Sequence, residues 1–277
     1  MPTYSYCLVN VFAEDFFAGN QLAVFTNATG LDEHTMQLLA AQLNLSETTF
    51  VFPSKVASAK VKIFTPTNEM AFAGHPSLGT AAVIRDGRTE VSLELKAGII
   101  PLRFNGDIAT LTANPATHRA GPLALDLSHA LGLPLSAFAE PAQFVDSGTE
   151  QLIVPLKTVD DVMACQPAAQ RFSDAVLQGR NRDGTLVWAW QNGEIIARYF
   201  WSKHGQIVED NGTGSACANL GAYLLKQGVQ LPFAATMIQG HKAGRLAHLR
   251  LSITADRQVE VGGRVVDVGR GEFDLTF

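Results

Sequence analysis

Four polar side chains in this sequence stand where they could carry out chemistry, and Glu47 is the first of them. It lies in the segment 45–51 (LSETTFV), where a helical pattern gives way to an apolar strand. Burial in such a strand raises the pKa of a carboxyl group toward the range useful for proton transfer. A glutamate exposed at a strand edge, or one holding the helix end, is the commoner case. Glu47 is therefore a candidate acid or base that needs support from the rest of the chain.

His75, Asp210 and Ser215 are the other three. His75 lies in the segment 72–76 (FAGHP), where an imidazole could donate a hydrogen bond or pass on a proton. Asp210 lies before a glycine-bearing turn in the segment 208–215 (VEDNGTGS), and Ser215 could bind a carboxylate through its hydroxyl group and backbone N–H. Each also has a structural explanation, because a histidine at a helix start, an aspartate in a turn and a serine N-cap are common.

Glycines mark the two points at which these side chains enter helices. Gly74 comes before one apolar helical pattern, and Gly212 and Gly214 come before another in the second half. The first N–H groups of a helix have no partner within it and lie at the positive end of its dipole. Two such helix starts, one from each half, would suit a carboxylate, since glycine lets a ligand approach the backbone closely. The competing explanation is a pair of ordinary turns.

The elements that must position these groups are mostly strands. Segments that alternate with period two, such as 60–65 (KVKIFT), are separated by glycine-containing turns, and few helices interrupt them. This pattern argues against a parallel βαβ sheet. Four helices are predicted: one that Asp32 caps, one over 125–131, and one after each glycine turn. The last two are apolar on all sides and lie about 140 positions apart, which indicates buried helices and an internal duplication.

Composition excludes several classes of protein. The chain has 277 residues, 47% of them hydrophobic and 17% charged, which is typical of a globular protein of one large or two ordinary domains. Its net charge of -5 argues against a nucleic-acid partner. No apolar stretch reaches about 18 residues, so no membrane partner is expected. Cys7, Cys165 and Cys217 are odd in number and widely spaced, which favours reduced thiols and a cytoplasmic location.

Cofactor and metal motifs are also missing. The sequence has no GxSxG, GxxxxGK[ST], HExxH or strand-linked GxGxxG segment. His241 and His248 have no partner at a metal-ligand spacing, and Cys217 fits a small residue inside its helix. We therefore expect no cofactor and no metal ion.

Several segments, taken together and in order, resemble the phenazine-biosynthesis F (PhzF-like) isomerases, which are related in fold to diaminopimelate epimerase. The resemblance covers nearly the whole chain. It is carried by segments 19–25 (GNQLAVF), 45–51 (LSETTFV), 63–66 (IFTP), 72–76 (FAGHP), 209–216 (EDNGTGSA) and 262–266 (GGRVV). Two departures stand out: Gln21 replaces the usual proline after Gly-Asn, and Asn211-Gly212 replaces a proline before Thr-Gly-Ser.

The resemblance implies an α+β fold of two similar halves, each a mostly antiparallel curved sheet or barrel around a central helix. The expected domains are 1–116 and 117–277, with the option that the last strands, about 260–277, return to the first domain. The active site is expected in the cleft between the halves. A homodimer is expected from the family as well.

By motif position, the resemblance assigns roles to the candidate residues. Glu47 looks like the catalytic acid or base, and His75 and Asp210 look like substrate-contacting and proton-relay groups. The carboxylate-binding and cleft-lining positions would be Gly74, Gly214, Ser215 and Asn20.

These roles predict a cofactor-independent isomerase of a small carboxylate-bearing metabolite. Related epimerases use two thiols on opposite faces of a carbon, whereas Ala73 and the segment 213–215 (TGS) stand at those places here. A single glutamate can remove a proton from one carbon and return it to another, which moves a double bond. Two alternatives stay open. One is an epimerase or racemase of an amino-acid-like substrate, with Glu47 and Asp210 as opposed bases; the other is a non-catalytic small-molecule-binding protein.

Overall fold

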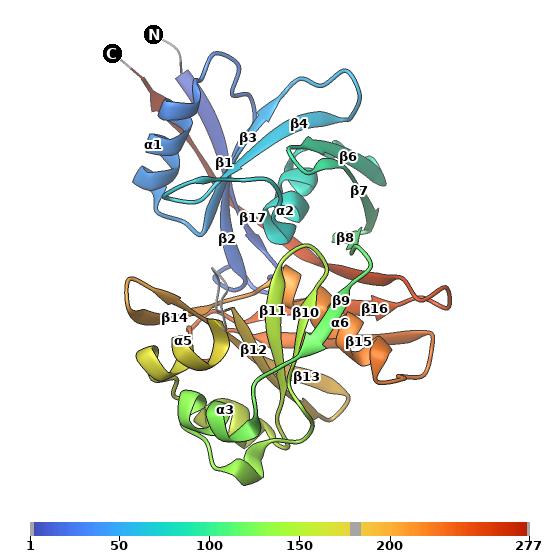
Figure 1. Ribbon diagram of the computed structural model, residues 1–277. Helices are drawn as coiled ribbons and strands as arrows, with labels where there is room; N and C mark the ends of the chain where they lie inside the picture. The colour runs from blue at the N-terminus through green and yellow to red at the C-terminus, as the bar shows by residue number, and fades with distance from the viewer. Residues whose placement is uncertain (1–2, 178–183, 276–277) are drawn as a thin grey trace. The chain divides into compact units, whose positions relative to one another are not determined.

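The computed structural model describes residues 3–177 and 184–275 of the chain (Figure 1). The chain divides into two compact units. Unit 1 contains residues 1–112 and 262–277, and unit 2 contains residues 113–261.

The strands of unit 1 form a closed ring. Among the described residues, eight strands pair in the order β17-β1-β2-β3-β4-β6-β7-β8, and β8 pairs with β17 to close the ring. Strand β5 pairs with β4 beside it. The β2–β3 and β4–β6 pairs are parallel, and the other pairs with a printed register are antiparallel. The strands are β1 (Thr3–Val11), β2 (Asn20–Phe25), β3 (Glu47–Phe52), β4 (Ala59–Phe64), β5 (Glu69–Met70), β6 (Glu90–Leu95), β7 (Gly98–Asn105), β8 (Ile108–Thr112) and β17 (Val259–Asp274).

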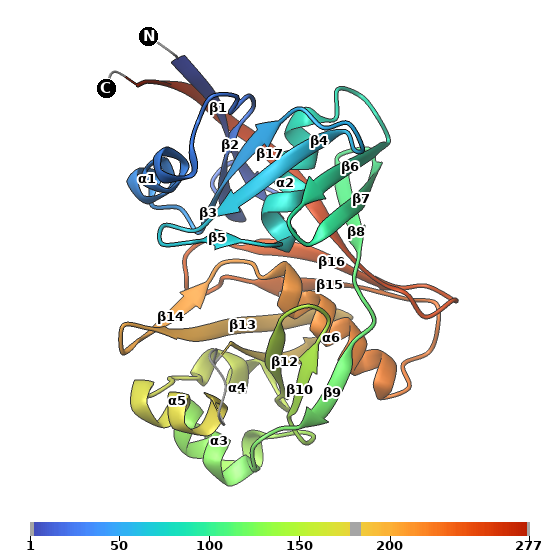
Figure 2. The ribbon, with the colours of Figure 1, turned by 45° about the horizontal axis from the view of Figure 1, so that its top comes forward.

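Helix α2 (Gly74–Ile84) runs inside this ring. It follows β5 and precedes β6, and it packs against β1, β2, β3, β6 and β8. Figure 2 shows it behind β4 and β6. Gly79 makes the close approach possible, since a Cβ atom there would lie 2.5 Å from Leu22 Cδ2 and 2.8 Å from Val11 Cγ2. A helix enclosed by strands must be apolar on all sides, which explains the pattern seen in the sequence.

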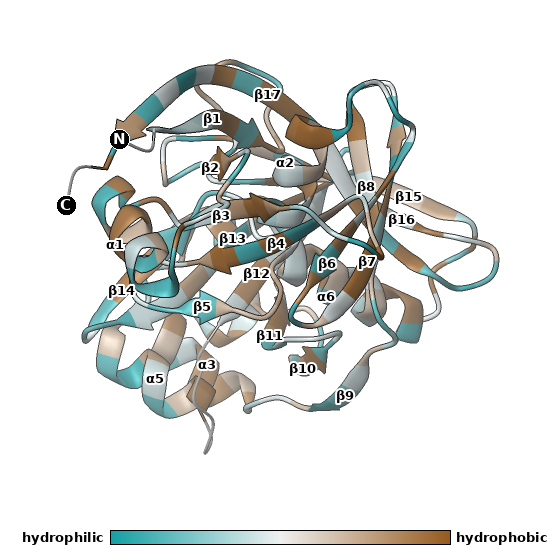
Figure 3. Cartoon of the chain, turned by 90° about the horizontal axis from the view of Figure 1, so that it is seen from above, coloured by the Kyte–Doolittle hydropathy of each residue, from teal (hydrophilic) through white to brown (hydrophobic). Residues whose placement is uncertain are grey.

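Helix α1 (Glu33–Leu43) packs outside the ring. The predicted cap is confirmed, because the Asp32 carboxylate accepts a hydrogen bond from the Thr35 N–H at 2.8 Å. Its buried side chains meet an aromatic cluster in which Phe25 stacks on Phe50 with ring centroids 4.8 Å apart. Hydrophobic and hydrophilic segments alternate along α1 in Figure 3, as expected for a helix with one face in the core.

Unit 2 repeats this arrangement. Its sheet has the order β9-β10-β11-β12-β13-β15-β16, with β14 paired to β13. The β11–β12 and β13–β15 pairs are parallel. Helix α6 (Gly214–Lys226) packs against β10 and β11 near one end of that order and against β16 at the other end, so the sheet curves around it. The strands are β9 (Thr117–Ala120), β10 (Gln143–Asp146), β11 (Glu150–Pro155), β12 (Thr185–Gln191), β13 (Glu194–Lys203), β14 (Gln206–Asp210), β15 (Phe233–Gln239) and β16 (Ala247–Ile253).

The outer face of the unit 2 sheet is covered by α3, the 3-10 helix η1, α4 and α5. The core between them includes Phe144, Phe172 and Phe200, all buried. The helices span α3 (Ala124–Leu131), η1 (Leu135–Ala137), α4 (Val159–Ala164) and α5 (Ala169–Leu177). The first of these agrees with the predicted third helix, whereas α4 and α5 were not predicted. No helix in the described part of the chain is long and apolar enough to span a membrane.

The architecture expected for each half is confirmed: a curved, mostly antiparallel sheet surrounds one central helix. The parallel pairs are an addition to that expectation. In each unit they arise because a helix connects two strands of the same sheet, α1 between β2 and β3 and α2 between β4 and β6 in unit 1.

Candidate active site

Glu47 is the first residue of β3, directly after the short connection from α1. The connection begins at Asn44, whose left-handed conformation (φ 50°) ends the helix and turns the chain toward the sheet. In the parallel β2–β3 pair, Glu47 lies opposite Leu22. Its side chain is only 16% exposed, so a carboxyl group enters the sheet at a largely buried position.

His75, the second residue of α2, lies beside Glu47. Its Nδ1 atom is 3.5 Å from Glu47 Oε2, and its Nε2 atom is 3.4 Å from the Gln21 carbonyl oxygen. Burial lowers the pKa of His75 to about 4, and the Gln21 carbonyl opposes this shift more weakly. A neighbouring carboxylate would also favour the charged ring, but the desolvation of the fully buried imidazole outweighs it. His75 is therefore neutral at pH 7.

The tautomer of His75 follows from its two neighbours. A carbonyl oxygen can only accept, so a neutral ring that donates to the Gln21 carbonyl carries its hydrogen on Nε2. Nδ1 then presents a lone pair toward Glu47 Oε2. A protonated Glu47 can donate to this lone pair, and the pair is thus suited to hold one proton between a carboxyl group and a neutral imidazole.

The rest of the unit 1 group is built around the start of α2. Gly74 is the first residue of the helix and follows Ala73, which has no side-chain group that could cap it. The hydroxyl groups of Thr49 and Thr80 are 2.8 Å apart in the core and join β3 to α2. Asn20, buried, is the first residue of β2, two positions before the residue opposite Glu47. The Thr49–Thr80 contact therefore ties the first half of β3 to the middle of α2.

In unit 2, Asp210 is the last residue of β14. Its Oδ1 atom accepts a hydrogen bond from the Asn211 N–H at 2.9 Å, and its Oδ2 atom accepts one from the Thr213 hydroxyl at 2.6 Å. The neighbouring Glu209 is engaged differently. Both of its carboxylate oxygens pair with the buried Arg198 guanidinium, at 3.0 and 2.8 Å. Of the two adjacent acidic residues, Glu209 therefore anchors β14, while Asp210 lies at the turn into α6.

Gly214 and Ser215 are the first two residues of α6. Thr213 is the N-cap but gives its hydroxyl hydrogen to Asp210 instead of capping the helix. The Ser215 hydroxyl accepts a hydrogen bond from Gln151 Nε2 at 2.9 Å. Because an amide nitrogen only donates, Ser215 can use its own hydrogen to donate to another acceptor. The start of α6 thus offers N–H and O–H donors together, as a carboxylate site requires.

The predicted site residues fall into two groups. Unit 1 brings together Glu47 and His75, with Gly74 and Asn20 on the adjoining elements. Unit 2 brings together three residues at one turn and helix start: Asp210, Gly214 and Ser215.

Two buried glutamines were not predicted. Gln151 binds Ser215 and Asn219, and Gln239 binds the turn that carries Asp210. A signal for Gln151 exists in the sequence, since 150–154 (EQLIV) repeats the pattern of 20–24 (NQLAV). Gln239 has no comparable signal.

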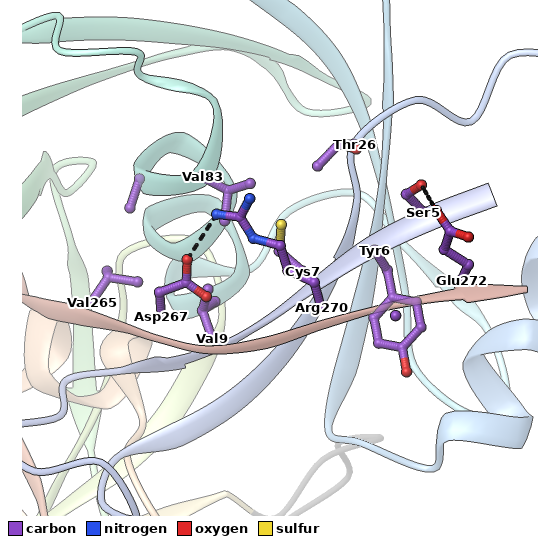
Figure 4. A pocket seen from close by; sticks show the side chains of 12 residues that line it. Ser5, Tyr6, Cys7, Val9, Thr26, Val83, Val265, Asp267, Arg270 and Glu272 are labelled. Atoms are coloured by element: carbon purple, nitrogen blue, oxygen red, sulfur yellow. Dashed lines mark hydrogen bonds and ion pairs between the residues drawn. The ribbon is translucent and has the colours of Figure 1, made fainter.

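A cavity of about 770 Å³ lies elsewhere in unit 1. It is lined by Cys7 and by the Asp267–Arg270 ion pair on β17, and reaches Ala82 and Val83 near the C-terminal end of α2 (Figure 4). Gly74, His75 and the neighbouring Glu47 lie at the opposite, N-terminal end of this helix. Burial raises the pKa of the Cys7 thiol, which makes it a poor nucleophile. Among residues 3–177 and 184–275, no group of three His, Cys, Asp or Glu side chains could hold a metal ion.

Comparisons with known proteins agree with this architecture. A family model described as phenazine biosynthesis-like protein matches residues 9–271. An uncharacterized isomerase from Pasteurella multocida is 35% identical, over 98% of this chain and 94% of that protein. The trans-2,3-dihydro-3-hydroxyanthranilate isomerase of Pseudomonas chlororaphis is 33% identical, over 98% of this chain and 100% of that protein.

Solved structures show the same fold. A PhzF-family protein from Bacillus anthracis superposes with a TM-score of 0.89 at 23% identity, covering 99% of this chain and 100% of that one. A predicted epimerase from Pseudomonas aeruginosa gives a TM-score of 0.82 at 28% identity, again over 99% and 100%. A hydroxyproline epimerase from Agrobacterium vitis shares the fold more distantly, with a TM-score of 0.63 at 13% identity over 99% and 93%.

Proposed function

The chain belongs to the phenazine biosynthesis-like (PhzC-PhzF) family, which includes relatives named as isomerases. We propose that it isomerises a small carboxylate-bearing metabolite without a cofactor, with Glu47 moving the proton. The observation that carries the proposal is the contact between Glu47 and the neutral, buried His75 at the start of α2. A carboxyl group that is largely removed from water and faces a proton acceptor is suited to general acid–base catalysis.

The proposed reaction conserves atoms and electrons. The Glu47 carboxylate takes a proton from one carbon of the substrate, and the electron pair of that C–H bond forms a new double bond to the neighbouring carbon. The π electrons of the substrate's original double bond move to its far carbon, and Glu47 then returns the proton to that far carbon. His75 Nδ1 accepts a hydrogen bond from the Glu47 carboxyl group while it holds the proton, which keeps the proton in place between the two steps.

In this proposal both groups of side chains act on one substrate molecule. The substrate carboxylate is bound at the start of α6 by the Ser215 hydroxyl and by backbone N–H groups near Gly214. Asp210 accepts a hydrogen bond from a hydroxyl or ammonium group of the substrate. The backbone at Gly74 stabilises negative charge as it develops, which is where most of the rate would be gained.

The test is proton exchange in heavy water. A panel of cyclic and acyclic carboxylic acids, beginning with trans-2,3-dihydro-3-hydroxyanthranilate because a relative is named for it, is followed by NMR for deuterium uptake and product. We expect Glu47→Gln to lower both rates by a factor of about 10² to 10⁴. The matched control is Glu69→Gln, which removes a carboxylate of the same unit that pairs with Lys96 and should leave both rates unchanged.

The two rival functions give different results. Inversion at the exchanged carbon, with no movement of a double bond, would establish an epimerase with two opposed bases. Binding of a panel compound with no exchange and no product would establish a non-catalytic binding protein. If Glu47→Gln kept most of the exchange, the role of Glu47 would be wrong whatever the product.

A further inference from the structure

Gln239, the last residue of β15, is fully buried beside the turn that carries Asp210. Its Oε1 atom accepts a hydrogen bond from the Thr213 N–H at 3.2 Å. Its Nε2 atom donates to the Asp210 carbonyl oxygen at 2.9 Å and to the Thr213 hydroxyl at 3.0 Å. Three hydrogen bonds therefore join this one side chain to both ends of a four-residue turn.

The direction of each hydrogen bond between Gln239 and Thr213 follows from the chemistry of its donor and acceptor. A backbone N–H only donates, so the atom of Gln239 facing Thr213 N must be the amide oxygen, and the amide nitrogen must face the Thr213 hydroxyl. The hydroxyl oxygen then accepts from Gln239, and its own hydrogen points to Asp210 Oδ2 at 2.6 Å. The Gln239 amide thus orients the Thr213 hydroxyl group so that it donates its hydrogen to Asp210 Oδ2.

The backbone that carries Gln239 is itself held tightly. Gly240, the next residue, has a φ of +92°, and a Cβ atom there would lie 2.0 Å from the Arg245 carbonyl oxygen and 2.8 Å from that of Asn211. Only glycine fits such a position without strain. The chain after β15 therefore packs directly on the chain after Asp210, which keeps Gln239 in register with the turn.

We propose that Gln239 and Thr213 are positioning residues that fix the orientation of the Asp210 carboxylate for substrate. The inference rests on the proposed function, in which Asp210 contacts the substrate. Oδ2 is occupied by the Thr213 hydroxyl and Oδ1 by the Asn211 N–H, so the carboxylate plane cannot rotate without losing a hydrogen bond. A fixed acceptor of this kind selects substrates that carry a hydroxyl or ammonium group at one defined distance from their carboxylate.

The test compares Thr213→Val, which keeps the shape but loses the hydroxyl, with Thr213→Ser, which keeps the hydroxyl. Loss of one hydrogen bond to a charged group is worth a factor of about 10 to 100 in rate. We expect Thr213→Val and Gln239→Leu to lower kcat/KM by that factor and Thr213→Ser to stay near the parent. Crystal structures should show the Asp210 carboxylate turned in the first two variants and unmoved in the third. Thermal midpoints identify any loss of folded protein.

A purely structural role would lower the thermal midpoint of Thr213→Val and leave kcat/KM per folded molecule at the parent value, and that result overturns the inference. Asp210→Asn separates this failure from failure of the proposed function. If Asp210→Asn reacts at the parent rate, Asp210 has no role in the reaction. The crystal structure of Thr213→Val then decides the inference alone: a turned carboxylate supports it, and an unmoved one overturns it.

Discussion

Units 1 and 2 have the same strand connections but place their polar side chains differently. In each, a parallel pair is followed by an antiparallel strand, a short antiparallel partner, a central helix and a strand parallel to the earlier one. Register makes residues of the two units directly comparable. Glu47 lies opposite Leu22 in unit 1, and Thr185 lies opposite Leu152 in unit 2. The place that holds a carboxyl group in unit 1 holds a hydroxyl group in unit 2.

The short strand before the central helix carries an acidic residue in both units. Glu69 pairs with Phe64 in unit 1, and Asp210 pairs with Tyr199 in unit 2. Glu69 forms an ion pair with the exposed Lys96, whereas Asp210 is held by Thr213. The two units therefore share the sheet and the central helix, while the proposed site uses a different acidic position in each unit. This asymmetry favours one acid–base group, Glu47, over two equivalent bases.

The largest expected effect separates Glu47 from Asp210. Glu47→Gln removes the proton carrier and should cost a factor of about 10² to 10⁴ in kcat. Asp210→Asn removes only an acceptor and should cost a factor of about 10 to 100. Steady-state kinetics on the same substrate measures both. Equal losses in the two variants, with inversion at the exchanged carbon, would show that Glu47 and Asp210 act as two equivalent bases. That result would contradict the interpretation that Glu47 alone moves the proton.

The second prediction concerns His75, because its counterpart at the start of α6 is Ser215, which does not titrate in this range. Burial lowers the pKa of His75 from 6.5 to about 4, so below pH 6.5 the unfolded chain binds a proton that the folded chain does not. The free energy of unfolding should fall by about 3 kcal/mol between pH 6.5 and 4 on this account. His75→Gln should remove that part of the slope in urea titrations.

A third, smaller effect tests whether the two central helices are packed alike. A Cβ atom on Gly79 would lie 2.5 Å from a Leu22 methyl carbon, and one on Gly221 would lie 2.6 Å from a Val259 methyl carbon. Each glycine-to-alanine change should therefore destabilise its own unit by about 1 to 3 kcal/mol. All three tryptophans of the chain lie within 113–261, so Trp fluorescence follows unit 2 and circular dichroism follows both. A fluorescence shift from Gly79→Ala equal to that from Gly221→Ala would show that the units unfold together.

The smallest effect is expected at Glu69. It occupies the position of Asp210, but its ion pair with Lys96 spans 3.5 Å and the lysine is 68% exposed. Such pairs contribute less than about 1 kcal/mol. Glu69→Gln should thus change neither activity nor, measurably, the urea midpoint. A large loss of activity in Glu69→Gln would show that Glu69 and Asp210 have equivalent roles. The two units would then not differ at this position.

The parts of the molecule that depend on local sequence could be predicted. Asp32 caps α1 through a residue three positions away, and the change from helix to strand at Glu47 follows from a change of period. The central helices were recognisable because a helix enclosed by strands has no polar face. Each of these signals is contained within a short segment of about ten residues.

The parts that depend on distant partners could not be predicted. Gln239 reaches residues 26 and 29 positions earlier, and Gln151 binds Ser215 64 positions later. A glutamine in a strand looks the same whether it faces solvent or a buried turn. The neutral state of His75 also depends on burial by the whole ring of strands, which no short segment reveals.

Strand β17 has a consequence for how the molecule folds. It closes the unit 1 ring by pairing Thr3 of β1 with Asp274, across nearly the whole chain. Unit 2 is complete in sequence before most of β17 is synthesised, so it can fold while β1 and β8 still expose unpaired strand edges. Long-range pairings of this kind form slowly, and open edges invite pairing with other chains. Closure of unit 1 is thus expected to be the late step, and the ribosome-bound chain is most prone to aggregate just before it.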